Sequence, residues 1–367
     1  MTKIITNNYT ILISFLIIMI ISFLNMHILN KNTSFFSNYL SKQILWYLIG
    51  ILIIIIINKL NTKSLFKYSK ILYLLSMLLL FIVLFSGRVI NGSKAWIIIG
   101  KVSFQPSELV KITLALFLAN YVSNYKIHSL KDEMILIIKV IIYTLIPSIL
   151  VFLEPDTGAI IFYFVIAFTI LLLKGIKKRW FIIFITLFLI ILIIFIILYL
   201  YNKELLIQFL GTSVFYRIER IIDFQNQNSY QLNQAIIAIG SAPFLKLNMH
   251  NLSLYIPEAS TDFIFASTIK NFGLLIGLII LLCYFLIDLY LLITIDNIKS
   301  QKIKLFLSSL TNVFIVGQLI NIMMNIGLIP IIGIPLPFLS YGGTTILMYS
   351  IFFGLTISFN KNSFKIS

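Results

Sequence analysis

Asp262 is the residue whose place in this sequence points most directly to chemistry. It comes just before Phe263-Ile264-Phe265, so its carboxylate stands at the edge of an apolar run. A carboxylate that is partly removed from water has a raised pKa and can act as a general base. The alternative role is structural. Ser260 or Thr261 can cap the following helix, and an acid in its first turn is stabilised by the helix dipole.

Glu108 and Lys111 form a second candidate pair. Pro106 and Ser107 come just before them and are typical of a helix start. Residues three apart lie on one face of a helix, so the carboxylate and the ammonium can pair where water is scarce. The pair either belongs to a functional site or anchors its helix as a structural ion pair.

Glu154 and Asp156 place two carboxylates between two apolar runs, on either side of Pro155. Carboxylates are costly near hydrocarbon, so a cluster of them calls for a chemical reason. The alternative for Asp156 is that it caps, together with Thr157, the helix that follows.

Two longer segments complete the pattern. Residues 215–224 carry Arg217 and Arg220 between apolar residues at helical spacing. This spacing predicts an amphipathic helix on the outer membrane surface, with a surface helix that caps the bundle as the alternative. Residues 325–344 contain three prolines and four glycines within an apolar stretch. Such breakers predict non-helical backbone that is buried in protein or lines a cavity, with kinked-helix packing as the alternative.

The residues named so far lie within or beside stretches that read as membrane helices. The 367 residues are 60% hydrophobic and only 11% charged, a composition that no soluble domain could bury. Apolar runs of about 18 residues can span a bilayer, and they predict an all-α, polytopic bundle of about ten helices. We expect a single domain over residues 1–367, with a long outer loop at about 202–262 before helix 8. The expected spans are 11–29, 44–58, 68–86, 107–125, 134–152, 156–173, 180–201, 263–287, 305–328 and 339–358.

Charge asymmetry predicts the orientation. Of the 28 lysines and arginines, 17 fall in segments on one side, whereas eight of the 12 acids fall on the other. Because cytoplasmic loops are enriched in lysine and arginine, we expect both termini in the cytoplasm and the acidic cluster outside. The net charge of +16 then reflects topology and attraction to anionic lipid. Nothing in the sequence favours nucleic acid as a partner.

Cysteine and histidine argue against two other chemistries. The single Cys283 falls within an expected span, so neither a disulfide framework nor a cysteine-based metal site is expected. The histidines are His27, His128 and His250, and they have no ligand spacing. The first apolar run has no convincing cleavage site after it, and we interpret it as a retained helix.

Four motifs, in this order and over nearly the full length, resemble the SEDS family (shape, elongation, division and sporulation), which includes RodA, FtsW and a sporulation paralogue, SpoVE. The motifs are Asn91–Trp96 with Phe104–Lys111, Glu154–Gly158, Ile256–Ala266 and Asn325–Thr344. Two stretches, Gly333–Pro337 and Ile237–Ser241, look more like RodA than FtsW.

The resemblance implies a ten-helix peptidoglycan glycosyltransferase of the bacterial inner membrane that polymerises lipid II during cell-wall elongation. Its implied partners are a class B penicillin-binding protein and other membrane proteins of the elongation complex. Asp262 matches the essential aspartate of the family, and Glu108 with Lys111 matches its required pair. Asp156 matches the acid of the family's Gln-Pro-Asp motif.

The chain also departs from the family pattern. Glu154 replaces the glutamine of that motif, Ser241–Phe244 replaces a glycine-rich stretch, and Lys270-Asn271 stands where two glutamates are usual. Lys94 occupies a site that is often arginine. These changes concern the long loop and substrate contacts more than the catalytic centre.

The implied reaction transfers a sugar from a diphospholipid to the 4-hydroxyl of an incoming sugar, with inversion at the anomeric carbon. Asp262 is the expected base. The candidates to bind phosphate are Lys111, Lys94, Arg217 and Arg220. No cofactor is certain, and a divalent cation, Mg or Mn, is a candidate to accompany the diphosphate. Apolar helices would furnish a groove for the lipid tails.

Three other functions stay open. One is a septal glycosyltransferase of the FtsW type. Another is a lipid II flippase, suggested by ten spans and a broken segment, although the acids lie at one interface rather than at the midplane. The third is a non-catalytic scaffold for a transpeptidase, which leaves Asp262 unexplained.

Overall fold

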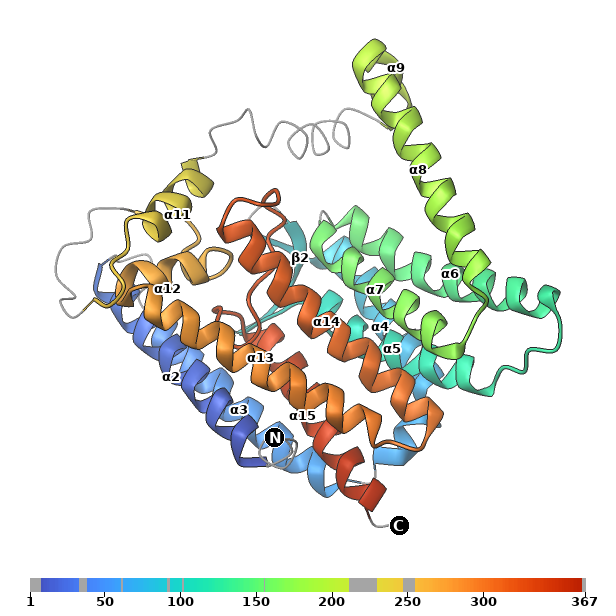
Figure 1. The fold of residues 1–367 in the computed structure, drawn as a ribbon, viewed down its shortest axis with the longest axis horizontal. Helices are drawn as coiled ribbons and strands as arrows, with labels where there is room; N and C mark the ends of the chain where they lie inside the picture. The colour runs from blue at the N-terminus through green and yellow to red at the C-terminus, as the bar shows by residue number, and fades with distance from the viewer. Residues whose placement is uncertain are drawn as a thin grey trace.

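The computed structural model describes residues 8–32, 38–60, 62–90, 93–100, 102–154, 156–210, 230–246 and 255–364. Over these residues the chain forms a bundle of long helices, as expected (Figure 1). Within this described part, eight helices are long and apolar enough to cross a membrane. The long helices are α2 (Asn8–Asn32), α3 (Tyr39–Lys59), α4 (Ser69–Ser86), α5 (Pro106–Asn124), α6 (Leu130–Leu153), α7 (Thr157–Lys174), α8 (Lys178–Tyr201), α13 (Leu274–Asp296), α14 (Gln301–Asn325) and α15 (Gly343–Phe364).

Shorter elements connect the long helices. They are the 3-10 helix η2 (Thr62–Phe66) and the helices α9 (Lys203–Leu210), α11 (Tyr230–Gly240) and α12 (Ile264–Phe272). α9, α11 and the residues just before α12 belong to the expected outer loop at 202–262, so part of that loop is helical. The amphipathic helix expected at 215–224 lies outside the described residues, as do Arg217 and Arg220.

α5 is an interior helix, since it packs against α4, α7, α14 and α15. Most of its residues are buried, including the polar residues Ser107, Glu108 and Lys111. Charged side chains within a membrane bundle are far less costly in its interior than against lipid. The fold therefore places Glu108 and Lys111 inside the protein.

Other helices present apolar side chains outward, as a lipid-facing surface requires. α8 is the clearest case, because it projects away from the bundle (Figure 1) and exposes large side chains such as Ile182 and Leu200. α4 and α6 also expose rows of leucine and isoleucine. The buried face of each of these two helices packs against α5 and the other helix of the pair.

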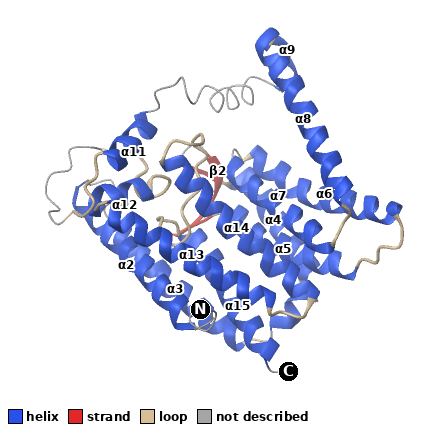
Figure 2. Cartoon of the chain, viewed as in Figure 1, coloured by secondary structure: helices blue, strands red, loops and turns tan. Residues whose placement is uncertain are grey.

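A small antiparallel sheet precedes α5, between the expected spans 68–86 and 107–125, so the expected all-α class is wrong for this segment (Figure 2). Its strands are β1 (Arg88–Ile90), β2 (Ser93–Ile99) and β3 (Val102–Phe104). Consecutive isoleucines in β2 favour an extended conformation, and Ile97 pairs with Phe104. Gly100, at φ 63°, makes the turn between β2 and β3. The sheet ends directly before Gln105 and the start of α5.

The expected span 263–287 is wrong as one helix, because α12 and α13 are separate. Gly273 divides them with φ 96°, a conformation that favours glycine. A Cβ atom there would lie 2.9 Å from the carbonyl oxygens of Pro243 and Phe244. The same carbonyls accept hydrogen bonds from the first amides of α13, at 3.0 and 2.9 Å. Long-range contact with this loop therefore ends α12, which an apolar pattern could not reveal.

The segment 326–342 is non-helical, as its prolines and glycines predicted. Side chains from distant helices satisfy its carbonyl groups. Gln43 Nε2 donates to the Ser340 carbonyl oxygen at 3.1 Å, and the Tyr284 hydroxyl donates to that of Pro337 at 2.5 Å. Backbone at membrane depth needs such partners because no water is present to supply them.

Candidate active site

A polar cavity of about 260 Å³ lies where four helices begin. The first residues of α7 and α15 line it or adjoin it, and Gln105 and Asp262 lead into α5 and α12. We call it the acidic cavity, since Asp156 and Asp262 both line it. Its lining residues are Ser93, Trp96, Gln105, Asp156, Thr157, Gly158, Thr261, Asp262, Ile332, Gly333, Pro335, Tyr341, Gly342 and Thr345. Each of the four sequence motifs contributes to this lining or adjoins it.

The carboxylate of Asp262 is half-buried in this cavity. Burial, followed by the nearby charge of Glu258, raises the pKa of Asp262 to about 7. The Glu258 carboxylate accepts a hydrogen bond of 2.8 Å from the Thr261 hydroxyl. Across the cavity, a Cβ atom at Gly333 would lie 3.6 Å from Asp262 Oδ2. The broken segment therefore passes close to the carboxylate that was expected to act as base.

Two asparagines of α14 hold the backbone at Asp262. Asn321 Nδ2 and Asn325 Nδ2 each donate a hydrogen bond of 2.9 Å to the Asp262 carbonyl oxygen. Asn321 Nδ2 also donates to the Ile334 carbonyl oxygen at 2.8 Å, and Asn325 Oδ1 accepts from the Ala266 amide at 3.0 Å. Both asparagines are fully buried. They connect the start of α12 to the broken segment.

Neither asparagine was among the expected site residues, although Asn325 is the first residue of the motif Asn325–Thr344. Their shared signal in the sequence is polarity, because two amides four residues apart interrupt an apolar helix. A buried amide needs partners. A separate network between α2 and α12 has the same character, since Asn25 is hydrogen-bonded to Ser267 and Thr268.

Asp156 is the second acid that lines the acidic cavity. Its Oδ2 atom accepts hydrogen bonds from Gln105 Nε2 at 2.7 Å and from Ser107 Oγ at 2.9 Å. Asp156 is the N-cap residue of α7, but its side chain makes no capping hydrogen bond. The capping role considered above for this side chain is therefore absent, and Asp156 instead ties the start of α7 to the start of α5.

Glu108 and Lys111 form the expected ion pair, with Lys111 Nζ 2.6 Å from Glu108 Oε1. Both side chains are buried, and Lys111 Nζ lies 4.2 Å from the centre of the Phe162 ring. Neither residue lines the acidic cavity. Glu108 directly follows Ser107 on α5, and Lys111 lies one turn further along. The Ser107 carbonyl accepts a hydrogen bond from Tyr163. The pair is thus buried next to the cavity, on the helix whose start contributes to it.

Glu154 is a buried acid whose carboxylate has no hydrogen-bond partner among the described residues. Its side chain is fully buried, and neither carboxylate oxygen has a hydrogen-bond partner within the described part of the chain. Burial, followed by the charge of Asp156, raises the pKa of Glu154 to about 8. At neutral pH the side chain is therefore mostly protonated and uncharged.

Lys94 has a structural role in this arrangement. Its Nζ atom donates to the carbonyl oxygens of Leu84 and Phe85, at 2.9 and 3.2 Å. These carbonyls belong to the last turn of α4, where a cation is favoured by the helix dipole. Its neighbours Ser93 and Trp96 line the acidic cavity, whereas Lys94 does not. Phosphate binding by Lys94 stays a prediction.

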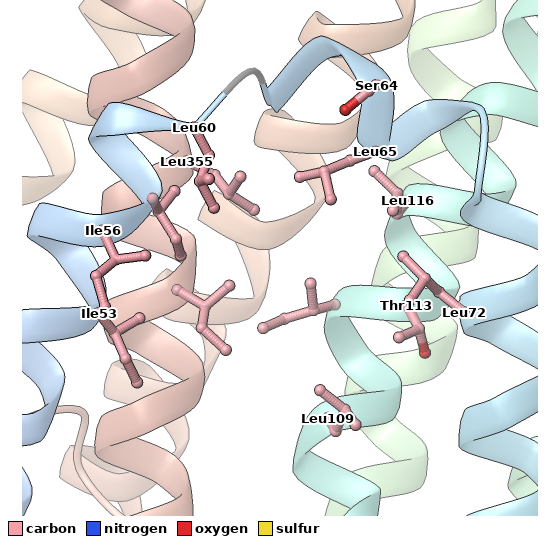
Figure 3. A pocket seen from close by; sticks show the side chains of 13 residues that line it. Ile53, Ile56, Leu60, Ser64, Leu65, Leu72, Leu109, Thr113, Leu116 and Leu355 are labelled. Atoms are coloured by element: carbon pink, nitrogen blue, oxygen red, sulfur yellow. The ribbon is translucent and has the colours of Figure 1, made fainter.

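A second cavity, of about 550 Å³, is apolar and runs between α3, α4, α5 and α15. Figure 3 shows its side chains pointing toward one another, with Leu109 and Leu116 on α5 facing Ile53 on α3 and Leu355 on α15. Ser64 and Thr113 are the polar residues among those that line it. Its lining follows α5 from beside Glu108 toward the opposite end of the bundle.

Comparison with known proteins gives consistent matches. The family FTSW_RODA_SPOVE, described as "Cell cycle protein", matches residues 2–364. Peptidoglycan glycosyltransferase MrdB of Helicobacter pylori (strain ATCC 700392 / 26695) is 29% identical over 322 residues, covering 86% of this chain and 81% of that protein. Probable peptidoglycan glycosyltransferase FtsW of Buchnera aphidicola subsp. Baizongia pistaciae is 33% identical over 327 residues, covering 85% and 81%.

Solved structures share the fold. A chain from a peptidoglycan synthase complex superposes with a TM-score of 0.80 at 22% identity, covering 98% of both chains. The rod-shape-determining protein RodA of Thermus thermophilus superposes with a TM-score of 0.69 at 22% identity, covering 97% of both chains.

Proposed function

The chain belongs to the FtsW/RodA/SpoVE family of cell cycle proteins, and from this membership we propose that it is a peptidoglycan glycosyltransferase that polymerises lipid II. The observation that carries the proposal is the acidic cavity. It combines Asp262, a carboxylate with a pKa of about 7, with the starts of four helices. A base and a site for anions are what transfer from a diphospholipid requires.

In the proposed reaction, Asp262 accepts the proton of the acceptor 4-hydroxyl as its oxygen attacks the anomeric carbon of the donor. The bond from that carbon to the diphosphate oxygen breaks, and the diphosphate leaves with the electron pair. A single displacement of this kind inverts the anomeric carbon, so an α-linked donor yields a β-linked glycan. General-base catalysis of this type contributes roughly 10²- to 10⁴-fold.

The departing diphosphate would meet the helix starts that surround the cavity. Amide groups in the first turn of a helix lack partners within the helix, and the helix dipole favours an anion there. Lys111 adds a positive charge behind this region, although its Nζ is engaged with Glu108. Lys94, Arg217 and Arg220 are the further cations proposed to contact phosphate.

A divalent cation fits the acidic cavity only in company with the substrate. The described residues contain no group of three histidines, cysteines or acids that could hold a metal by itself. Mg²⁺, however, is commonly bound by one or two carboxylates together with substrate phosphates. Asp156 would be its protein ligand here, and the cation would neutralise charge on the diphosphate.

The apolar cavity is the proposed site for an isoprenoid tail. A long hydrocarbon chain requires an apolar channel, and leucine and isoleucine side chains dominate this one. Because it begins beside Glu108 on α5, a tail lodged there would keep its head group toward the acidic cavity.

The chain is a multi-pass membrane protein, with eight described helices able to span a bilayer. We propose the bacterial inner membrane, with both termini in the cytoplasm and the acidic cavity outside. The basic inner segments support this orientation. Single cysteines placed at Tyr255 and Lys299, in a Cys283→Ser background, test it in intact cells. An impermeant thiol reagent should label the cysteine at 255 alone. Labelling only at 299 would show that the orientation is the reverse of the proposed one.

A class B penicillin-binding protein is the proposed partner, within the machinery of cell-wall elongation. The fold of this protein matches a chain of a peptidoglycan synthase complex, which is compatible with such a partner. The RodA-like stretches of the sequence favour elongation over septal synthesis. Affinity purification followed by identification of the bound transpeptidase separates the two roles.

Purified protein supplied with lipid II in detergent tests the central proposal. Glycan polymer supports a glycosyltransferase, and its absence from a folded, partner-bound preparation contradicts one. The same preparation in vesicles separates the alternatives. Translocation without polymer would indicate a flippase, and neither activity would indicate a scaffold.

A further inference from the structure

A third cavity, of about 320 Å³, lies at the end of the bundle opposite the acidic cavity. α5 runs from Gln105, at the acidic cavity, to this one, a distance of roughly 28 Å at the helical rise. Residues of α4 and the last two turns of α5 line it, namely Ser69, Lys70, Phe117, Asn120, Tyr121, Asn124 and Tyr125. The proposed reaction does not use this cavity.

Lys139 stands beside this third cavity and is unusual in its depth. It lies nine residues after the start of α6, hence roughly 14 Å along the helix, and its side chain is exposed. Its Nζ atom lies 6.0 Å from the centre of the Tyr125 ring, and it interacts with the side chain of Tyr121. The ammonium group thus reaches the aromatic side chains at the end of α5, as a lysine on a lipid-facing helix does when it extends toward the interface.

The acids of α6 are engaged elsewhere. Asp132 accepts hydrogen bonds from the Ser129 hydroxyl and backbone amide. Glu133 accepts one from Trp180 and lies 3.8 Å from Arg179. Lys139 therefore adds its positive charge to that of Lys70 at the third cavity, rather than neutralising a neighbouring carboxylate.

The remaining walls suit a polar head group at a membrane interface. Tyr121 packs edge-to-face with Tyr143 at 5.5 Å, and tyrosine is favoured where one end of a side chain is apolar and the other is wet. Asn124 Nδ2 donates to Asn120 Oδ1, and Asn120 Nδ2 donates to the carbonyl of Phe66. These contacts hold the amides in place along the cavity wall.

An apolar surface for acyl chains adjoins the head-group site. On α4, Leu74 and Leu78 are 55% and 54% exposed, and on α6, Ile138 and Ile142 are 47% and 48% exposed. Since α4 and α6 pack against each other, these exposed side chains adjoin Lys70 and Lys139 along the two helices. Cations, a polar cavity and an apolar surface thus lie next to one another, as binding of a phospholipid requires.

We propose that Lys70 and Lys139, with Tyr121 and Tyr125, bind the phosphodiester head group of an anionic phospholipid of the surrounding bilayer. Basic pockets between membrane helices are suited to such head groups, and each lysine contributes a factor of about five in affinity. The site is independent of the proposed catalytic cavity. Its occupant is a structural lipid, not the glycan donor.

The test uses the full chain in neutral detergent, titrated with phosphatidylglycerol and followed by native mass spectrometry. The double variant Lys70→Gln/Lys139→Gln should bind about 25-fold more weakly, and Lys70→Arg/Lys139→Arg should retain binding. The matched control is Lys59→Gln/Lys299→Gln, which removes two exposed cations away from the site. The control should bind like the unchanged protein. Equal losses in both double variants would overturn the site in favour of diffuse charge attraction.

Two further arms identify the occupant. Phosphatidylcholine with the same chains should bind far more weakly, and inorganic phosphate should not displace phosphatidylglycerol. Equal binding of phosphatidylcholine, or displacement by phosphate, would overturn the proposal. A photoactivatable phosphatidylglycerol added to the unchanged protein should label peptides containing Lys70, Tyr125 or Lys139. Labelling confined to other peptides would overturn the site whether or not the variants fold.

Discussion

Asn325 holds Asp262 through the backbone, with its Nδ2 atom 2.9 Å from the Asp262 carbonyl oxygen. Its Oδ1 atom accepts a hydrogen bond from the Ala266 amide, one turn further along. One buried side chain therefore defines both where α12 starts and how Asp262 enters the acidic cavity. The carboxylate itself makes no part of this contact and stays available for chemistry.

The Asn325→Ala change should lower kcat by about 10- to 100-fold, because a small misplacement of a catalytic group is costly. It should also lower the Tm, since the Asp262 carbonyl loses one of its two side-chain donors. Asn312→Ala is the matched control. Asn312 is an amide of the same helix that donates to Thr169 at 2.9 Å. Asn312→Ala should lower the Tm but leave kcat nearly unchanged. If the two variants lose kcat equally, Asn325 has no special role in positioning Asp262.

Asp262→Asn should lower lipid II polymerisation by at least about 10²-fold, because asparagine keeps the shape but not the basicity. The N-cap residue of α12 is Phe263, which makes no side-chain capping bond, so the cap expected at Ser260 or Thr261 and the acid expected in the first turn are both wrong. If Asp262 has only a structural role before α12, asparagine has the same shape and the change should be nearly silent. Thermal stability and partner binding should survive. Asp296→Asn, an exposed acid at the other end of the bundle, is the control. Near-normal glycan synthesis by Asp262→Asn would eliminate the general-base mechanism.

The pH dependence of kcat/KM should follow the pKa of Asp262, which burial and Glu258 raise to about 7. A general base is active when ionised, so the rate should rise with pH below about 7 and level off above it. Glu154 also titrates near this range, so Glu154→Gln is the control. If Asp262 sets the inflection of the profile, this variant should keep it. A flat profile from about pH 5.5 to 8 would contradict the assignment.

Glu108→Ala should destabilise the protein by about 3–5 kcal/mol, because it leaves the Lys111 ammonium buried without its partner. The double change Glu108→Gln/Lys111→Met leaves no buried charge and should cost clearly less stability. A thermal-shift series of the single and double variants measures the difference. If Glu108→Gln/Lys111→Met loses as much stability as the single variants Glu108→Gln and Lys111→Met added together, the two residues are not coupled.

Glu154→Gln should stabilise the protein at high pH. The pKa of Glu154 rises from 4.5 to about 8 on folding, so the folded state binds the proton more tightly. Its contribution to stability is thus fully present below about pH 4.5 and is lost as the pH rises toward 8. The Tm of Glu154→Gln should match that of the unchanged protein at about pH 4 and exceed it above about pH 8. Glu204→Gln, which changes an exposed acid, should show no such pH-dependent difference in Tm.

Local pattern alone determined much of this protein. Apolar runs predicted the helices of the bundle, and the spacing of Glu108 and Lys111 predicted their ion pair. The junction of Asp262 with an apolar run predicted a carboxylate of raised pKa. Each of these is a property of neighbouring residues, which share a helix face or a membrane boundary whatever the remainder of the chain does.

Which distant groups meet depends on how the helices pack, and the local pattern does not predict it. The division of α12 from α13 depends on the loop carbonyl at Pro243, and the position of Asp262 depends on Asn321 and Asn325 in α14. Asp156 shares a cavity with Asp262 although the two are far apart in the chain. Hydrophobic periodicity shows which face of a helix is apolar, but not which element packs against that face. Contacts between elements arise from packing and from the need to satisfy buried polar groups, and neither leaves a local signature.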